Sequence, residues 1–345
     1  MGYYDGCKLL SMRDLNNKKP EIYISTSNRN AGKTTFFNRL CLNKFIQKKE
    51  KFCILYRYNY EIDDCAGKFF SCISDLFFKN HEMSYKMASK NVYAELFFDG
   101  KSCGYATSLN MYEQIKKCSH KMSDVKRILF DEFQSEKNRY LSNEMVAFLS
   151  IHTSLARGGG EQVKYLPVYM ISNTVSIANP YFLSMGITDR LRNNTNYLKG
   201  NGFVLEQGFY QEVANMQIAS GFNQAFSSEK YVAYAAQNVY LNDNEAFVQK
   251  PSGSNRYICT IAYNNKKYSI RSYFDSGVYY MSRKIDNDNT NKISFSTNSH
   301  EDNFILANVS SPYARMLKNI FECGKIRFEN QECKTVFLDM LRYNI

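Results

Sequence analysis

The sequence lacks any apolar run long enough to span a membrane, and residues 1–19 are polar without an apolar centre. A transmembrane helix needs about 20 mostly apolar residues. A secretory signal peptide needs a shorter but continuous apolar segment behind a basic start. We therefore expect a soluble, intracellular protein with no membrane partner.

The ten cysteines include no C-x-x-C pair, and the four histidines do not lie at metal-ligand spacing beside them. Structural zinc sites draw their ligands from such closely spaced groups. Disulfide frameworks belong to exported chains, and this chain shows no export signal. We therefore expect reduced, mostly buried thiols and neither a zinc site nor a disulfide framework.

The composition is that of a globular protein of 345 residues, with 44% hydrophobic and 22% charged residues. A chain of this length can build two domains, each with its own core. Lys and Arg outnumber Asp and Glu by 44 to 33, which gives a formal net charge of +11. A basic surface suits a polyanion such as nucleic acid, although many basic proteins bind none.

The first 200 residues alternate short β-rich runs with helical periodicity. We expect buried strands over residues 21–26, 52–58, 128–130 and 166–171. We expect one helix that begins at Lys33 and a second helix over residues 143–155. Residues 92–98 and 103–107 flank Asp99-Gly100 and predict a hairpin. This alternation predicts an α/β domain with a parallel sheet over residues 1–200.

The pattern changes after residue 200. Residues 201–228 are weakly periodic and suggest a linker or a small bridging subdomain. Residues 229–345 predict a smaller α+β domain with an antiparallel sheet. Its expected strands are residues 246–249, 257–262, 267–273 and 278–282, with a turn at 264–265, and its expected helices are residues 311–321 and 331–343.

A phosphate-binding motif lies between the first expected strand and the first expected helix. Residues 27–34 match G-x-x-x-x-G-K-[ST], except that Ser27 replaces the first glycine. Backbone N–H groups of such a loop hold phosphates, Lys33 is expected to reach the β- and γ-phosphates, and the Thr34 hydroxyl is expected to bind Mg²⁺. The residues expected to hold ATP are Ser27, Asn28, Arg29, Asn30, Ala31, Gly32, Lys33, Thr34 and Thr35.

The substitution at Ser27 leaves the entry conformation of the loop open, because serine tolerates a positive φ poorly. A Gly-Lys-Thr tripeptide also occurs by chance in ordinary loops. The flanking strand and helix make the phosphate site the better interpretation.

A pair of acids follows the third expected strand, where Ile-Leu-Phe ends in Asp131-Glu132. Asp131 is expected to bind Mg²⁺ through water, and Glu132 to polarise the attacking water. Alone, such a pair is more simply a strand that ends in solvated acids. Lys126 and Arg127 precede the apolar triplet, so we expect the buried part of this strand to be short.

These motifs together resemble one protein family. The resemblance rests on the phosphate loop, on residues 128–133 (Ile-Leu-Phe-Asp-Glu-Phe), and on Ser172-Asn173 followed by Asn-Pro-Tyr-Phe at 179–182. The family is the DNA encapsidation protein, or packaging ATPase, of small podophages whose linear genomes carry terminal proteins. The resemblance spans nearly the whole chain. It implies kinship to large terminases and to the additional-strand class of P-loop NTPases.

The resemblance assigns further roles residue by residue. Arg157 lies where the family has an arginine finger that enters the next subunit's site, and residues 158–160 would let it reposition. Ser172 and Asn173 match a polar element that senses the γ-phosphate. Arg57 resembles a basic residue near the nucleotide. Lys116 or Lys117 matches a second basic group at the subunit interface, and the two are not distinguished.

Some of these assignments have a simpler local interpretation. An arginine at the end of a helix favours the helix dipole, and residues 158–160 are also typical of a surface loop. A Ser-Asn pair at a strand end often caps a turn. The lone Arg57 is only moderately suggestive.

The family's C-terminal domain is an RNase H-like fold without catalytic acids. Two-metal nucleases need clustered carboxylates, one of them within the first strand. Residues 257–263 contain no acid, so we expect no cleavage. The basic residues there are expected either to contact nucleic-acid phosphates or to form a solvated face, and both interpretations stay open. These residues are Lys266, Lys267, Arg271, Arg283 and Lys284.

The family implies a motor that uses ATP and Mg²⁺ to move double-stranded viral DNA into a procapsid. It implies a homo-oligomeric ring, of five subunits by the resemblance, at the portal of the procapsid in the host cytoplasm. It also implies that the ring is absent from the mature virion. Some members also use a structural packaging RNA. Two other functions stay open: a cellular-type DNA translocase or helicase-like ATPase, and a nucleotide-gated nucleic-acid-binding protein that does not hydrolyse.

Overall fold

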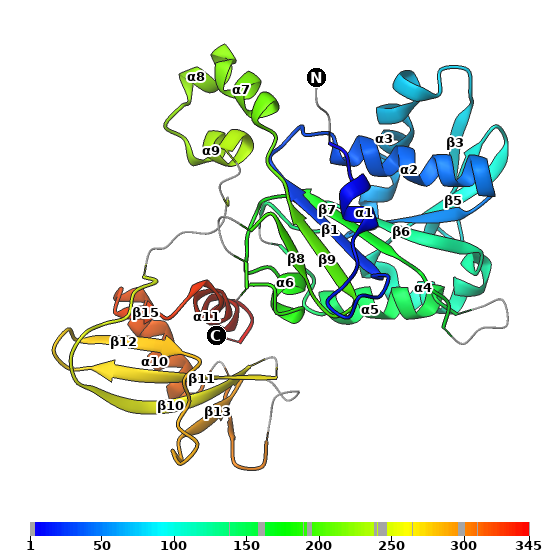
Figure 1. Cartoon of the computed structure of the whole chain (residues 1–345). Coiled ribbons are helices and arrows are strands. Elements are labelled where there is room, and N and C mark those ends of the chain that lie inside the picture. Colours follow the sequence, from blue (N-terminus) through cyan, green and yellow to red (C-terminus); the bar gives the residue numbers. More distant parts are fainter. Residues whose placement is uncertain are drawn as a thin grey trace. The chain divides into compact units, whose positions relative to one another are not determined.

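The computed structural model describes residues 4–344 except 138, 158–162, 189, 192–194, 238–239, 241–246, 264, 296–300 and 309 (Figure 1). The chain divides into two compact units. The first comprises Met1–Met185 and Arg190–Asn242, and the second comprises Gly186–Asp189 and Asp243–Ile345. In the described part of the chain, no helix combines the length and apolar character that crossing a bilayer requires.

The first unit is built on a nine-stranded sheet with the order β3-β4-β5-β2-β6-β7-β1-β9-β8. The six strands from β5 to β9 in this order are parallel, whereas β3, β4 and β8 add antiparallel edges. The strands are β1 (Ile22–Ser27), β2 (Lys51–Tyr56), β3 (Met83–Ala88), β4 (Tyr93–Phe98), β5 (Lys101–Ser108), β6 (Val125–Asp131), β7 (Val168–Asn173), β8 (Tyr197–Lys199) and β9 (Phe203–Gln207).

The strand order confirms the expected additional-strand arrangement. β1 carries the phosphate loop and β6 carries the acidic pair, and β7 lies between them with parallel pairing to both. Ser27 pairs with Asn173, and Asp131 pairs with Ile171. Parallel strands bring their carboxyl ends to one edge, where open α/β sheets bind ligands. The loop, the acids and the Ser-Asn pair therefore meet at that edge.

Alternating side chains of these strands cover two different faces of the sheet. On one face, Leu129 and Tyr169 join the core beneath α2 (Lys33–Lys48) and α3 (Tyr60–Phe77). On the other face, Phe130 stacks on Phe148 of α5 (Glu144–Leu155) at 6.0 Å between ring centroids. The remaining helical elements up to residue 184 are α1 (Cys7–Ser11), η1 (Leu109–Met111), α4 (Tyr112–Cys118), η2 (Ser119–Met122) and α6 (Pro180–Ser184).

The buried part of β6 is longer than expected. Its burial reaches back to Val125, and Arg127 is only 6% exposed. Arg127 is paired with Glu50, the residue just before β2. The prediction of a short buried segment was wrong because a carboxylate distant in sequence compensates this arginine.

Residues 203–207 fall in the segment that the sequence marked as weakly periodic, and they form β9 beside β1. Three helices follow: α7 (Gln211–Ala219), α8 (Gly221–Ala225) and α9 (Lys230–Gln237). In Figure 1 they form a small helical group apart from the sheet layers of the first unit. Main-chain hydrogen bonds at Arg29 and Tyr210 connect this group to the phosphate loop, as described below.

The second unit contains a six-stranded sheet with the order β14-β13-β10-β11-β12-β15. β10, β11 and β12 are antiparallel neighbours, as expected. β13 pairs in parallel with β10 and β14, and β15 pairs in parallel with β12, so the sheet is mixed and the prediction of an antiparallel sheet holds only for its centre. The expected strand at 246–249 is a single bridge at Val248 in its described part, and Asn264 of the expected turn lies outside the described residues.

The elements of the second unit are β10 (Asn255–Tyr263), β11 (Lys266–Tyr273), β12 (Val278–Ser282), β13 (Lys292–Ser294), β14 (Ile305–Leu306), α10 (Pro312–Glu322), β15 (Ile326–Phe328) and α11 (Gln331–Asn344). The apolar sides of α10 and α11 pack with the sheet in a separate core. The second unit therefore has the buried apolar interior of an independent domain.

Candidate nucleotide site

The phosphate loop has the backbone conformation that anion binding requires. Ser27 is the last residue of β1, and α2 begins at Lys33. The left-handed residues are Asn30 (φ 61°) and Gly32 (φ 97°), the latter at the N-cap of α2. Asparagine and glycine both tolerate this region. Serine replaces glycine at position 27 without strain because the strand keeps it extended.

The Lys33 ammonium is buried among neutral oxygens. The side chain is 6% exposed, and Nζ donates to Ser27 Oγ at 2.6 Å. It also lies 3.2 Å from Asn28 O and 3.5 Å from Asn173 Oδ1. A buried cation with neutral acceptors, at the N-terminus of a 16-residue helix, suits a polyanion. The residues present therefore fit the terminal phosphates of a nucleotide.

The electrostatics of the site follow from this burial. Burial lowers the pKa of Lys33 to about 8, although the charge of Asp131 opposes the change. Burial raises the pKa of Asp131 to about 6, and the neighbouring Glu132 charge adds to the rise. A hydrogen bond with the Thr34 hydroxyl and the charge of Lys33 act in the opposite direction. Burial thus penalises the charged form of both groups, and an anion beside Lys33 and a cation beside Asp131 would offset this cost.

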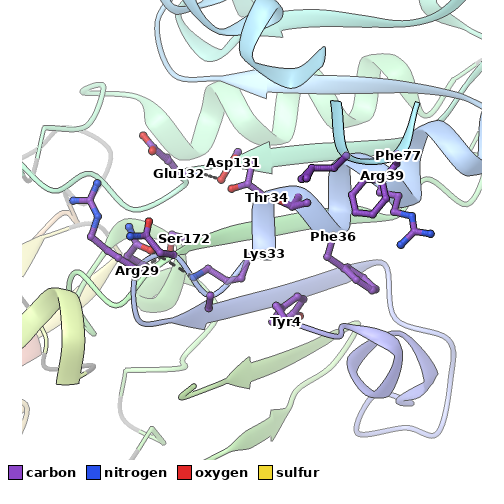
Figure 2. Close-up of a pocket in the computed structure, with 16 residues that line it drawn as sticks. Tyr4, Arg29, Lys33, Thr34, Phe36, Arg39, Phe77, Asp131, Glu132 and Ser172 are labelled. Carbon is purple, nitrogen blue, oxygen red and sulfur yellow. Dashed lines mark hydrogen bonds between the residues drawn. The ribbon is translucent and has the colours of Figure 1, made fainter. Parts of the chain in front are cut away.

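Figure 2 shows Thr34 beside Asp131, with Glu132 pointing away from them. Glu132 is exposed in a left-handed conformation (φ 54°), and its N–H donates to Asp131 Oδ1 at 2.9 Å. The Thr34 hydroxyl and the Asp131 carboxylate are hard oxygen donors of the kind that suits Mg²⁺. This ion usually keeps several waters and also binds phosphate oxygens. The two acids therefore have different positions, one turned to the loop and one left for a water molecule.

These groups line one pocket of about 700 Å³. It is lined by Arg29 through Thr35 of the loop, by Asp131 and Glu132, and by Ser172 and Asn173. Ser27 and Asn28, which were expected to contact ATP, are buried beneath the loop. They accept hydrogen bonds from the Lys33 ammonium instead. The pocket also includes Tyr4, Phe36, Arg39, Leu76 and Phe77, which no motif in the sequence indicated.

Arg57 does not line this pocket. Its buried guanidinium forms an ion pair with Glu144, in which Nε donates to Oε1 at 2.9 Å. Nη2 donates to Phe133 O at 2.6 Å, and Nη1 lies 3.4 Å from Glu132 O. The Tyr181 hydroxyl donates to the same Glu144 oxygen at 2.7 Å. Arg57 therefore holds the backbone that follows the acidic pair, a structural role toward the site.

Arg157 is exposed immediately after α5 and does not line the pocket of its own chain. Residues 158–160, which were expected to let it reposition, lie outside the described residues. Lys116 and Lys117 are both exposed in the last turn of α4. An exposed arginine outside its own pocket is what a group supplied to another subunit requires.

The basic residues of the second unit are mostly engaged in contacts. Lys266 and Arg283 approach the buried Glu332 at 2.8 and 3.4 Å, and Lys267 pairs with Glu301 at 2.8 Å. The Arg271 guanidinium lies over the Tyr257 ring at 4.8 Å. Lys284 is exposed, and its carbonyl accepts from Arg271. Part of this basic set stabilises the fold.

The contacts between the phosphate loop and the group α7–α9 have no signal in the sequence. Asn28 Oδ1 accepts from Tyr210 N at 3.1 Å, and Arg29 N donates to Ala235 O at 3.2 Å. Arg29 Nη1 donates to Glu136 at 2.9 Å, and the Tyr234 hydroxyl donates to the same oxygen at 2.7 Å. The partners are about 100 to 200 residues apart, and no local pattern identifies them.

The chain matches one known protein family over residues 2–345, and that family is described as Podovirus DNA encapsidation protein (Gp16). The chain belongs to this family. It is a viral DNA packaging protein, and the sequence-based resemblance is confirmed. The DNA packaging protein of Bacillus phage B103 is 26% identical over 91% of this chain and 94% of its own length. That of Bacillus phage phi29 is 25% identical over 91% of both.

The fold is shared over the same length. A chain of the bacteriophage Phi-29 viral genome packaging motor assembly matches with a TM-score of 0.71 and 21% identity, over 99% of both chains. A chain of the Phi-28 gp11 DNA packaging motor matches with a TM-score of 0.65 and 17% identity. Both units of this encapsidation protein thus have the architecture of a packaging-motor chain.

Proposed function

We propose that this encapsidation protein hydrolyses Mg–ATP and uses the energy to move double-stranded viral DNA into a procapsid. The observation that carries the proposal is the buried Lys33 ammonium at the start of α2, with Asp131 and Glu132 in the same pocket. This arrangement supplies an anion site, a metal ligand and a base for water. A protein that only binds nucleotide has no need of the base.

Each residue has a separate role. Lys33 and the N–H groups of the loop hold the β- and γ-phosphates, and Thr34 and Asp131 hold Mg²⁺. The ion neutralises the charge that develops on the phosphates. Glu132 orients the attacking water and accepts its proton. Asn173, which is 3.5 Å from Lys33 Nζ, reports with Ser172 whether the γ-phosphate is present.

We further propose that the site is completed between subunits of a homo-oligomeric ring of five. Arg157 would enter a neighbour's pocket and stabilise the transition-state charge, an effect worth roughly 10³–10⁵ in rate. Its exposure after α5, outside its own pocket, supports this role. One of Lys116 and Lys117 would act at the same interface. The relative from phage phi29 belongs to a motor assembly, which supports a ring.

The ring would act at the portal of the procapsid in the host cytoplasm and be absent from the mature virion. A structural packaging RNA is a further partner in this proposal. The first compact unit (Met1–Met185 and Arg190–Asn242) would be the ATPase, and it includes β9, α7 and α8 of the segment expected as a linker. The second unit (Gly186–Asp189 and Asp243–Ile345) would bind nucleic acid or the portal. β10 carries no acid, so the last domain binds rather than cleaves. Its exposed Lys284 and half-buried Arg271 are candidates for phosphate contacts.

The proposal is tested with Glu132→Gln, which keeps the size of the side chain but removes the base. We expect ATP binding within about twofold of wild type and a loss of at least a hundredfold in DNA-stimulated hydrolysis, since removing a general base costs about 10²–10⁴. Nuclease protection of DNA in the presence of procapsids should disappear in parallel. Glu113→Gln, an exposed acid on α4, is the matched control.

The same measurements distinguish the other two functions. Absence of hydrolysis in the wild type would leave a nucleotide-gated binding protein. Hydrolysis that is unaffected by Glu132→Gln would show that Glu132 is not the base. Hydrolysis coupled to DNA movement without any dependence on procapsids would indicate a general translocase. Lys33→Ala should abolish ATP binding in either case, because it removes the charge that faces the phosphates.

A further inference from the structure

The pocket extends well beyond the groups that handle phosphates. Its second end is lined by Phe36 and Arg39 of α2, by Leu76 and Phe77 at the end of α3, and by Tyr4. Figure 2 shows Phe36, Arg39 and Phe77 on the side of Thr34 away from Glu132 and Arg29. None of these side chains has a role in the reaction proposed above.

The chemistry of the first end fixes the direction of the nucleotide. The γ-phosphate must face Glu132, because that carboxylate activates the water that attacks it. The β-phosphate must lie at the N-terminus of α2, between Lys33 and Thr34. The ribose and base therefore leave the loop on the opposite side, toward Phe36 and Phe77, within the same pocket of about 700 Å³.

The second end presents aromatic and cationic surface to solvent. Phe77 is 41% exposed and Leu76 is 66% exposed. The Arg39 guanidinium lies over the Phe77 ring at 4.2 Å and is itself exposed. Planar guanidinium and phenyl groups are the surfaces on which bases stack. Exposed apolar surface is costly in water. A nucleotide base that covers these side chains would explain why they lie beside a phosphate site.

Phe36 is held in place by a buried support. The Tyr4 ring meets it edge-on at 5.4 Å, and a Cβ built on Gly6 would lie 2.6 Å from the Phe36 ring, so a side chain at position 6 would displace that ring. The Tyr4 hydroxyl donates to Glu206 at 2.7 Å, which fixes Tyr4 from the other side. Phe36 is thus a rigid part of the pocket wall, whereas Arg39 and Phe77 form its open rim.

We propose that Phe36, Arg39 and Phe77 form the base-binding part of the nucleotide site and favour a purine over a pyrimidine by stacking. This inference rests on the proposed nucleotide function and adds the residues that recognise the base. A purine offers more stacking area than a pyrimidine, and stacking of a base on an aromatic side chain contributes roughly 1–3 kcal/mol. The phosphate loop alone gives no such preference.

The test compares ligands that share the phosphates and differ in the base. Binding of ATP, CTP and inorganic tripolyphosphate, each with Mg²⁺, is measured by calorimetry on the full chain. For the wild type we expect ATP to bind about 5- to 100-fold more tightly than tripolyphosphate, with CTP in between. In Phe77→Ala and Arg39→Met this advantage of ATP should shrink at least fivefold, while the affinity for tripolyphosphate stays the same.

Controls separate base recognition from folding and assembly. Phe77→Tyr keeps the ring and should retain the preference for ATP. Phe274→Ala removes an aromatic side chain that is 62% exposed in the second unit and should change nothing. An unchanged ratio of ATP to tripolyphosphate affinity in Phe77→Ala overturns the base site while the phosphate site stands. So does a change confined to oligomeric state, because Phe77 would then be covered by another subunit. A wild type that binds neither ligand overturns both this inference and the proposed function.

Discussion

Lys33 shows how burial adjusts a single residue for its ligand. Its ammonium is removed from water and bonded to neutral oxygens, so its pKa falls to about 8. Phosphate charge favours the protonated form and should restore a higher pKa in the complex. In the free protein Lys33 is therefore partly deprotonated above pH 8. Binding of ATP at such a pH must be accompanied by uptake of a proton.

We predict that ATP affinity falls by up to tenfold per pH unit above pH 8, relative to its value near pH 7. Calorimetry at pH 8.5 in two buffers of different ionisation enthalpy should reveal proton uptake on binding. Lys33→Arg keeps a charge that does not titrate in this range, so its affinity should not follow pH in this way. Equal pH dependence in both proteins would show that another group titrates.

Arg57 provides a second prediction at this scale. Its buried guanidinium bonds to Glu144 and to the main-chain oxygens of Phe133 and Glu132. Arg57→Lys keeps the charge but loses the planar fork, so the Glu132 backbone gains freedom. We expect kcat to fall about tenfold or more, with ATP affinity within about twofold, because small displacements of a catalytic group are costly. Steady-state kinetics and equilibrium binding together measure this division.

A result in which ATP affinity falls while kcat is unchanged would place Arg57 at the nucleotide after all. Arg127→Lys is a useful control, because that arginine is also buried and paired, with Glu50, but lies toward the other end of β6. Arg127→Lys should lower the free energy of unfolding, but it should not lower kcat while leaving ATP affinity unchanged.

The sequence predicted those site residues whose signal is local. The loop and the acidic pair are contiguous motifs, and parallel pairing of β1, β7 and β6 brings them together. Arg57 was expected near the nucleotide from the family resemblance. Its partner, Glu144, is 87 residues away, and no pattern in the sequence connects the two. Phe36, Arg39 and Phe77 were missed for a similar reason, since nothing in α2 or α3 alone marks an aromatic side chain as part of a site.

At the scale of elements, the phosphate loop is tied to the helices that follow the sheet. Glu136 Oε1 accepts from both Arg29 Nη1 and the Tyr234 hydroxyl, and the Tyr234 ring is 1% exposed. The Glu136 carboxylate therefore connects α9 with the loop. Phosphates bound at the loop would compete for the Arg29 guanidinium, which lines the same pocket.

We predict that Glu136→Gln loosens α7–α9 without unfolding the sheet. Replacing a charge-assisted acceptor by a neutral one costs roughly 1–3 kcal/mol of local stability. Hydrogen exchange of the amides of 211–237 should accelerate about 5- to 100-fold, while amides of β1 and β7 keep their protection. Glu229→Gln, an exposed acid just before α9, should leave exchange unchanged. Equal acceleration throughout the first unit would contradict a local tie.

Most of the elements that were predicted lay within two or three residues of their expected positions, because their apolar periodicity is strong. Many others were not predicted, including α3, β3, β8, α7–α9 and β13–β15. β9 was not predicted, and Glu206 explains why. This acid is buried in a strand, which a sequence pattern does not favour. Hydroxyl groups of Tyr4, Ser25 and Tyr197 donate to it. A buried acid can be assigned to a strand only when its hydrogen-bond partners are known. Here one of those partners is 202 residues away in the sequence.

At the scale of the whole molecule, each unit has its own core, and the second has a buried ionic centre of its own. Glu332 is 1% exposed and accepts from Lys266 Nζ at 2.8 Å and from the Tyr268 hydroxyl at 3.0 Å. Arg283 approaches it at 3.4 Å. Two of the five basic residues expected to meet nucleic acid thus share a carboxylate, which the sequence alone could not reveal because α11 follows β11 by many residues.

This centre should make the second unit sensitive to acid. Burial alone would raise the pKa of Glu332, but the hydrogen bond and charge of Lys266 outweigh it, and the net pKa is lowered. A carboxyl group with a lowered folded pKa stabilises fully above its unfolded value, near 4.5, and loses this contribution as pH falls through the folded value. Stability of the second unit should therefore be constant from pH 7 to 5 and decline below pH 4.5.

Glu332→Gln should remove this pH dependence and lower stability at pH 7 by roughly 1–3 kcal/mol, because Lys266 and Arg283 lose a buried charged acceptor. Urea unfolding of the full chain at pH 7 and pH 4, followed by hydrogen exchange in β10 and β11, measures both effects. Glu301→Gln removes the exposed partner of Lys267 and should change stability by less than about 1 kcal/mol. If the two variants behaved alike, Glu332 would be no more than a surface ion pair, and Lys266 and Arg283 would be as available to DNA as Lys284.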